Sequence, residues 1–157
     1  MDQPIVVGIS DMKVATNPGS LITYALGSCV GICLHDPLNN IAGLSHVLLP
    51  DCNLCPNDSN VAKFANTAVE ELVRRMERIG ANRFRLTAKI AGGARLFGGA
   101  GGIQVGERNI TSVKAELNRL RIRLVAEDTG LDYGRTVEFR TDGSMYIKTA
   151  LKGTKQI

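Results

Sequence analysis

Residues 25–50 read ALGSCVGICLHDPLNNIAGLSHVLLP, two apolar runs joined by a short polar segment. The first run, residues 29–34, and the second, residues 41–49, each have the length and composition of a strand. A connection this short, with Asp, Pro and Asn in it, favours an antiparallel hairpin. The hairpin carries Cys29 at the start of its first strand and His46, one of the chain's two histidines, in its second.

The rest of the chain alternates strand and helix patterns. Apolar residues at intervals of three and four predict amphipathic helices at residues 62–80 and 109–120, with Gly80 placed to cap the first. An Asp-Gly pair at residues 142–143 predicts a second hairpin. Together these elements predict an α+β or α/β sandwich in a single domain, residues 1–157, with a mixed, largely antiparallel sheet and two principal helices. Further strands are predicted at residues 5–9, 21–26, 84–91, 122–127, 135–140 and 144–151.

Composition narrows the class of protein. The chain is 44% hydrophobic and 22% charged, and no apolar run approaches the roughly 20 residues needed to cross a bilayer, so we expect no membrane insertion. The first residues lack the basic segment and cleavage site of a secretory signal, which predicts a cytoplasmic protein with reduced cysteines. The net charge of +4 is scattered and only 4% of residues are aromatic, so nucleic acid is not an expected partner, whereas an acidic protein is.

A cysteine and a histidine on neighbouring strands are the minimum apparatus for thiol-based acyl chemistry. An imidazolium close to Cys29 would lower the thiol pKa from about 8.5 and create a nucleophile, with His46 as the base. Gly27 and Ser28 would let nearby backbone N–H groups form an oxyanion hole, and Thr23 could orient the imidazole. The plainer alternatives are a small buried cysteine, a core histidine and an ordinary strand threonine.

Zinc binding is the rival interpretation, because Cys29, Cys33, Cys52 and Cys55 supply four thiols. If residues 29–34 are extended, however, Cys29 and Cys33 lie about 13 Å apart, too far for one tetrahedral ion. We therefore expect no metal and no organic cofactor, with Cys52 and Cys55 as thiols of a surface loop. The glycine-rich residues 92–102 lack the Gly-Lys-Ser/Thr of a phosphate-binding loop, and form either a turn system or part of a site.

Several separated motifs, in this order, resemble the chemoreceptor glutamine deamidase family, CheD. The resemblance covers nearly the whole chain and departs from the family pattern at Leu131, where a second glycine is more usual. The motifs are LGSCV at residues 26–30, AGLSH at 42–46 with Leu49-Pro50, AKIAGGA at 88–94, GERN at 106–109, DTG at 128–130 and Gly134-Arg135.

The resemblance implies a cytoplasmic enzyme of chemotaxis that converts selected glutamines on the cytoplasmic helices of methyl-accepting receptors to glutamate. It implies a Cys29–His46–Thr23 triad on a sandwich related to toxin-type deamidases. It also implies binding to a CheC-type phosphatase and possible hydrolysis of glutamyl methyl esters. Two alternatives stay open: a non-catalytic adaptor that binds such a phosphatase, and a zinc-stabilised domain. The sequence leaves open the receptor, the target glutamines, the oligomeric state and the role of Cys33.

Overall fold

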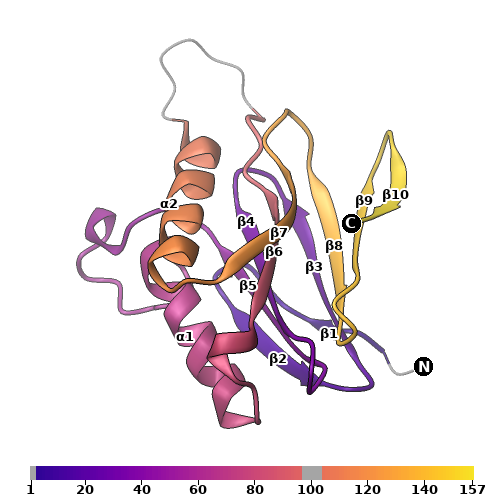
Figure 1. The fold of residues 1–157 in the computed structure, drawn as a ribbon. Helices are drawn as coiled ribbons and strands as arrows, with labels where there is room; N and C mark the ends of the chain where they lie inside the picture. The colour runs from indigo at the N-terminus through magenta and orange to yellow at the C-terminus, as the bar shows by residue number, and fades with distance from the viewer. Residues whose placement is uncertain (1–2, 97–103) are drawn as a thin grey trace.

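The computed structural model describes residues 3–96 and 104–157 and arranges them in three layers (Figure 1). Helices α1 (Ala65–Arg78) and α2 (Val105–Arg119) form one outer layer. A five-stranded sheet lies in the middle, and a second five-stranded sheet forms the other outer layer. The prediction of an α+β fold with two principal helices is confirmed, but the single predicted sheet is wrong, because the described strands divide between two.

The middle sheet is built around the predicted hairpin. Its central strand β4 pairs antiparallel with β5 on one side and with β6 on the other, and β7 runs parallel to β6. Every residue of β4 and β5 is buried, which explains why both read as nearly continuous apolar runs. The strand order is β2 (Met12–Thr16), β5 (Ile41–Val47), β4 (Val30–Asp36), β6 (Thr87–Gly92) and β7 (Arg123–Thr129).

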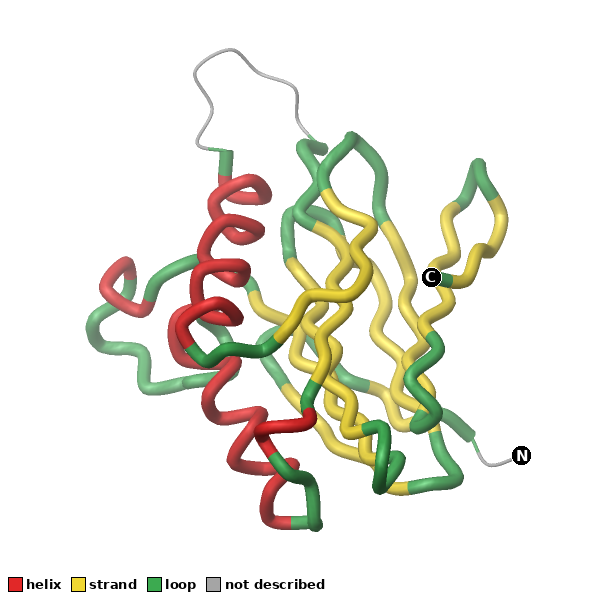
Figure 2. Tube along the Cα trace, viewed as in Figure 1, coloured by secondary structure: helices red, strands yellow, loops and turns green. Residues whose placement is uncertain are grey.

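The outer sheet has one face against the middle sheet and one face without helices (Figure 2). Its strands accordingly alternate between buried and more exposed side chains, as in β8. The predicted Asp-Gly turn joins β8 to β9 in an antiparallel hairpin, so that prediction is confirmed. The strand order is β1 (Ile5–Val6), β3 (Ser20–Leu26), β8 (Arg135–Arg140), β9 (Met145–Thr149) and β10 (Gly153–Gln156).

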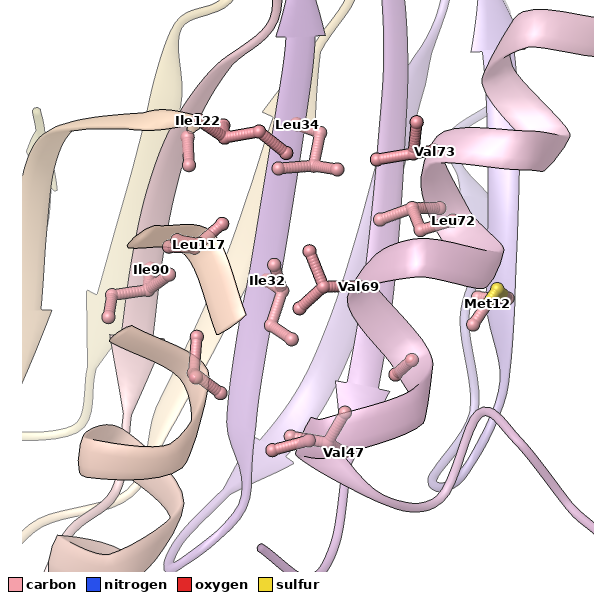
Figure 3. Close-up of a cluster of buried hydrophobic side chains, with 14 of the residues drawn as sticks. Met12, Ile32, Leu34, Val47, Val69, Leu72, Val73, Ile90, Leu117 and Ile122 are labelled. Atoms are coloured by element: carbon pink, nitrogen blue, oxygen red, sulfur yellow. The ribbon is translucent and has the colours of Figure 1, made fainter. Parts of the chain in front are cut away.

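Two apolar clusters hold the three layers together. One lies between the helices and the middle sheet, where Ile32 and Leu34 of β4 face Val69 and Leu72 of α1 (Figure 3). The other lies between the sheets and contains Cys29 and Cys33 with side chains such as Leu44 and Phe139. Because side chains alternate along a strand, the even-numbered positions of β4 face the helices and the odd-numbered positions face the other sheet. Cys29 therefore points into the space between the sheets.

Element ends differ from the predicted ones in a few places. Helix α1 begins at Ala65 instead of residue 62, since Phe64 is bridged to Leu49 as extended chain. Its end is as predicted: Gly80 takes φ +109° and its N–H donates to the Glu77 carbonyl, a typical C-terminal cap. Short 3₁₀ turns, η1 (Cys52–Leu54) and η2 (Arg83–Arg85), precede α1 and β6, and β2 and β10 were not predicted.

Helix α2 begins one turn earlier than predicted, at Val105 instead of residue 109, so the GERN motif lies inside the helix. Of the glycine-rich segment at residues 92–102, only residues 92–96 belong to the part of the chain that is described. Among the described residues, no helix is long and apolar enough to pass through a membrane.

Candidate active site

Cys29 and His46 project from the same face of the middle sheet. Gly31 of β4 lies opposite His46 of β5 in the antiparallel register, and Cys29 is two residues before Gly31. Side chains two apart share a face, so the thiol and the imidazole are diagonal neighbours on the face that packs against the outer sheet. Both are buried, Cys29 with 7% and His46 with 0% exposure. Gly31 has no side chain to stand between them.

Thr23 reaches the imidazole from the other sheet. It lies on β3 with its side chain fully buried, and its Oγ1 is 2.7 Å from Nδ1 of His46. The same hydroxyl donates to the carbonyl of Val7 at 2.7 Å. A hydroxyl has one hydrogen, so the Thr23 oxygen must accept a hydrogen bond from an Nδ1–H of His46. The neutral imidazole then carries its lone pair on Nε2.

The Nε2 atom of His46 is buried and has no hydrogen-bond partner within the described residues. A buried acceptor without a donor is costly, typically about 1–3 kcal/mol, and such atoms commonly mark functional sites. The structure gives no hydrogen bond between Nε2 and Cys29 Sγ across residues 3–96 and 104–157. The three side chains are thus gathered between the sheets, and Nε2 of His46 makes no hydrogen bond to the described residues.

Burial sets the protonation of both groups. It lowers the pKa of His46 from 6.5 to about 4, because the imidazolium would lose its hydration. It also raises the pKa of the Cys29 thiol above its ordinary value, although the residue's own backbone N–H, which faces the sulfur, acts to lower it. At neutral pH this conformation holds a neutral thiol and a neutral imidazole. The expected thiolate–imidazolium pair is not favoured in it, and the proton must move when the thiol reacts.

Three consecutive carbonyl groups fix the loop before β4. The Gly27 carbonyl accepts from Ala94 N at 2.8 Å, and the Cys29 carbonyl accepts from Gly93 N at 2.8 Å. The Ser28 carbonyl accepts from the Asn109 side chain at 2.9 Å. The loop before the cysteine is therefore held by the start of the glycine-rich segment and by α2.

The hydrogen bonds of the backbone N–H groups in this loop show which of them could contribute to the expected oxyanion hole. Gly27 N donates to the Ala25 carbonyl at 3.0 Å, so this N–H is occupied. Within the described part of the chain, the N–H groups of Ser28 and Cys29 donate to no carbonyl. The expectation that Gly27 and Ser28 let the chain bend, so that nearby N–H groups form an oxyanion hole, stays a prediction, and in the described residues the N–H groups of Ser28 and Cys29 are left without a carbonyl acceptor.

The glycine-rich segment supports this loop through a close backbone approach. Gly92 has φ +108°, and a Cβ there would lie 2.2 Å from the Cys29 carbonyl oxygen. Gly106 on α2 packs equally closely, with the position of its missing Cβ 2.6 Å from the Ala94 carbonyl oxygen. Residues 92–94 therefore contact the loop before β4, and whether the whole segment is a turn system or part of a site stays a prediction.

Asn109 is the residue of this site that the sequence reasoning missed. It is fully buried on α2, and its Nδ2 donates to the carbonyls of Ser28 at 2.9 Å and Leu48 at 3.0 Å. Its Oδ1 has no partner among the described residues. Its position in the GERN motif was the available signal, but the motif alone does not say what the side chain contacts.

The other three cysteines differ in burial. Cys33 is fully buried on β4, while Cys52 and Cys55 lie in and beside η1 with partial exposure, as expected for thiols of a surface loop. All four cysteines are free. In residues 3–96 and 104–157 we find no group of three or more His, Cys, Asp or Glu side chains placed to hold a metal ion.

Leu131, where the sequence departs from the family pattern, lies in a turn with positive φ at two consecutive residues. Leu131 adopts φ +60°, the left-handed region that a glycine would enter more easily, and follows Gly130 at φ +77°. Its carbonyl accepts from Arg95 N at 2.8 Å, which ties the turn to the segment that follows β6.

Fold and site together define a class: an α+β protein that gathers a cysteine, a histidine and a threonine between two sheets. Comparison with known proteins gives the family. A family model described as "CheD chemotactic sensory transduction" matches residues 48–149. The chain belongs to the CheD family.

Full-length relatives extend the similarity over nearly the whole chain. A protein of Lachnoclostridium phytofermentans is 48% identical over 100% of both chains. Proteins of Caldanaerobacter subterraneus subsp. tengcongensis (47%, over 96% of each chain) and Syntrophomonas wolfei subsp. wolfei (45%, over 100% of each) are similar. Each of the three is named "Probable chemoreceptor glutamine deamidase CheD".

Proposed function

We propose that this protein deamidates glutamine side chains of chemoreceptors, with Cys29 as nucleophile, His46 as general base and Thr23 as the group that orients His46. The observation that carries the proposal is the Thr23–His46 hydrogen bond of 2.7 Å, which leaves Nε2 free on the sheet face that also carries Cys29. The names of full-length relatives support glutamine as the substrate side chain and a chemoreceptor as the protein that bears it.

The reaction needs only groups of this chain and water. His46 Nε2 accepts the thiol proton as Cys29 Sγ forms a bond to the carboxamide carbon of glutamine. The negative charge on the carboxamide oxygen is stabilised by the free N–H groups of Ser28 and Cys29. The carbon–nitrogen bond then breaks, the proton on Nε2 passes to the departing ammonia, and a thioester remains. Water attacks the thioester with His46 as base, which yields glutamate and restores the thiol.

The neutral resting pair is compatible with this sequence of steps. A low pKa makes His46 a poor proton acceptor in the closed, buried site, and a raised pKa makes Cys29 a poor donor. Contact with the polar carboxamide and the developing oxyanion favours the charged forms, so proton transfer coincides with attack on the substrate.

The proposal extends to a second substrate and to a partner protein. A glutamyl methyl ester would react by the same route, with methanol in place of ammonia as the leaving group. A CheC-type phosphatase is proposed as a partner, and the cytoplasm as the compartment, as the family resemblance implies. A relationship of the sandwich to toxin-type cysteine–histidine deamidases, and its organisation as a single domain, belong to the same proposal.

Mass spectrometry of a receptor cytoplasmic fragment tests the proposal. Incubation with the protein should raise the fragment mass by about 1 Da for each converted glutamine, and Cys29→Ala should abolish the change. A Cys29→Ala protein with unimpaired deamidation would overturn the mechanism. A wild-type protein that binds a CheC-type phosphatase but never alters the fragment would instead support the adaptor alternative.

A further inference from the structure

One buried amide connects the loop that bears Cys29 with the end of the strand that bears His46. The Nδ2 of Asn109 donates both to the Ser28 carbonyl at 2.9 Å and to the Leu48 carbonyl at 3.0 Å. Ser28 directly precedes Cys29, and Leu48 is two residues beyond His46. Asn109 has 0% exposure, so no competing water hydrates these bonds from the surface.

The hydrogen bond to the Ser28 carbonyl also fixes the direction of the Cys29 N–H, because both groups belong to one planar peptide unit. The Ser28 carbonyl and the Cys29 N–H belong to one planar trans peptide unit and point in opposite directions. Because the carbonyl points to Asn109 on α2, the Cys29 N–H points away from α2. It faces the Cys29 sulfur and donates to no carbonyl of the described chain. That is the direction an oxyanion-hole donor requires.

We propose that Asn109 is a positioning residue for deamidation: its side-chain amide holds the Ser28–Cys29 peptide so that the Cys29 N–H is directed at the oxygen that becomes negative. This inference rests on the proposed function of Cys29. The neighbouring peptides are held by backbone donors, Ala94 N and Gly93 N, whereas the Ser28–Cys29 peptide depends on a side chain. Its orientation can therefore be removed by one substitution.

Asparagine has the donors that this place requires. Its amide NH₂ carries two hydrogens, which serve the two carbonyls, and an aspartate of the same shape has no hydrogen to donate when ionised. Asn109→Asp would place a carboxylate oxygen against two carbonyl oxygens. Asn109→Ala removes the donors without adding that repulsion, and the two variants together separate loss of the bonds from loss of volume.

Ser112 offers a matched control on the same helix. It lies three residues beyond Asn109, and its Oγ donates to the Pro50 carbonyl at 2.8 Å. Ser112→Ala therefore removes a bond of the same kind, from α2 to the segment after β5, but leaves the Ser28 carbonyl untouched. Thermal unfolding of all variants shows how much stability each substitution costs.

The experiment compares two reactions of Cys29 that differ in their need for an oxyanion hole. Propanal adds reversibly to the thiol: a carbon–sulfur bond forms, the carbonyl oxygen takes up the proton, and the resulting hemithioacetal resembles the tetrahedral intermediate. Iodoacetamide alkylates the same sulfur by displacing iodide, without forming an oxyanion. Protection of Cys29 by propanal is measured from the alkylation of the peptide that contains it, alongside kcat and KM for deamidation of the receptor fragment.

We expect Asn109→Ala to weaken propanal protection and to lower kcat about 10- to 100-fold, with KM and the rate of iodoacetamide alkylation within about threefold of wild type. Asn109→Asp should reduce propanal protection and kcat at least as much as Asn109→Ala does. Ser112→Ala should match the wild type in both quantities. Equal effects of Asn109→Ala and Ser112→Ala, or a parallel loss of alkylation and propanal protection, would overturn the inference. A wild type without deamidase activity whose propanal protection still depends on Asn109 would refute the proposed function alone.

Discussion

The hydroxyl of Thr23 determines which nitrogen of His46 carries the proton. Its hydrogen is given to the Val7 carbonyl at 2.7 Å, so it can only accept from the imidazole, 2.7 Å away. The proton of the neutral ring is therefore on Nδ1 and the lone pair on Nε2. A general base needs this tautomer, since an Nε2–H could not accept the proton of the thiol.

Substitution of Thr23 tests this assignment. Thr23→Val keeps the branched shape and removes the oxygen, so the buried imidazole is no longer held in one tautomer and orientation. We expect kcat for deamidation to fall about 10- to 100-fold with little change in KM, measured by ammonia release. Thr23→Ser retains the hydroxyl and should keep most of the activity. Equal losses in the two variants would show that packing, and not the hydrogen bond, is what matters at this position.

At the scale of single residues, the sequence predicts the side chains that we propose to react better than those that support them. Cys29 and His46 follow from a hairpin with a short connection, because pairing and alternation place them on one face. Asn109 does not follow, because its partners are backbone carbonyls 81 and 61 positions away. Every residue has a backbone carbonyl, so the sequence does not indicate which carbonyls will accept hydrogen bonds from a buried side-chain amide.

Individual elements were predicted where local chemistry decides them. The end of β4 is an example: Asp36 accepts from Leu38 N at 3.0 Å within its own turn, as the Asp-Pro sequence suggests. The same carboxylate also binds Arg85, with contacts of 3.0 and 3.1 Å, and this partner lies 49 positions away. Strand β10 was missed because all four of its residues are exposed, so it lacks an apolar pattern.

The end of β6 permits a paired test of close packing. Gly92 and Gly130 both have positive φ, +108° and +77°, but only a Cβ at Gly92 would collide, 2.2 Å from the Cys29 carbonyl oxygen. Alanine at either position costs about 1–2 kcal/mol in backbone strain. Gly92→Ala must also displace the Cys29 loop, so we expect a larger loss of stability and at least a tenfold fall in kcat.

Gly130→Ala should keep its kcat, because nothing lies within 4 Å of the added carbon. Urea unfolding and deamidation assays measure the two effects separately. If both variants lost the same activity, backbone strain would explain the result, and the approach of Gly92 to Cys29 would have no special role.

The division into two sheets is a property of the whole molecule that local patterns do not contain. Strands β3 and β4 follow one another along the chain, yet β3 lies in the outer sheet and β4 in the middle one. Strands β4 and β5 of the middle sheet are buried on both faces and β8 of the outer sheet alternates, but neither pattern says which strands pair with one another. This division brings Thr23 across the interface to His46, and the site forms because the sheets pack face to face.

Two buried side chains, His46 and Asp36, make the stability of the whole molecule depend on pH in two separate acidic ranges. Burial lowers the pKa of His46 from 6.5 to about 4, so the unfolded chain takes up a proton that the folded one resists. The neutral state of His46 therefore contributes about 3 kcal/mol to the free energy of unfolding above pH 6.5, and this contribution is lost as the pH falls to 4. Asp36 affects stability at lower pH. Burial favours a higher pKa for its carboxyl group, but hydrogen bonds from Arg85 and from backbone N–H groups outweigh burial and lower the pKa from 3.8 to about 2.

The free energy of unfolding, measured with urea between pH 7.5 and pH 2, should therefore fall in two steps. His46→Gln should remove the step between pH 6.5 and pH 4, because glutamine does not titrate there. Asp36→Asn should retain that step and reduce the fall between pH 4 and pH 2 by about 2 kcal/mol, while other carboxylates with lowered pKa values still contribute to it. It should also lower stability at neutral pH through loss of the Arg85 ion pair. A His46→Gln protein that lost as much stability as the wild type between pH 6.5 and pH 4 would mean that the folded state does not lower the pKa of the imidazole, and that the neutral base assigned to the site is wrong.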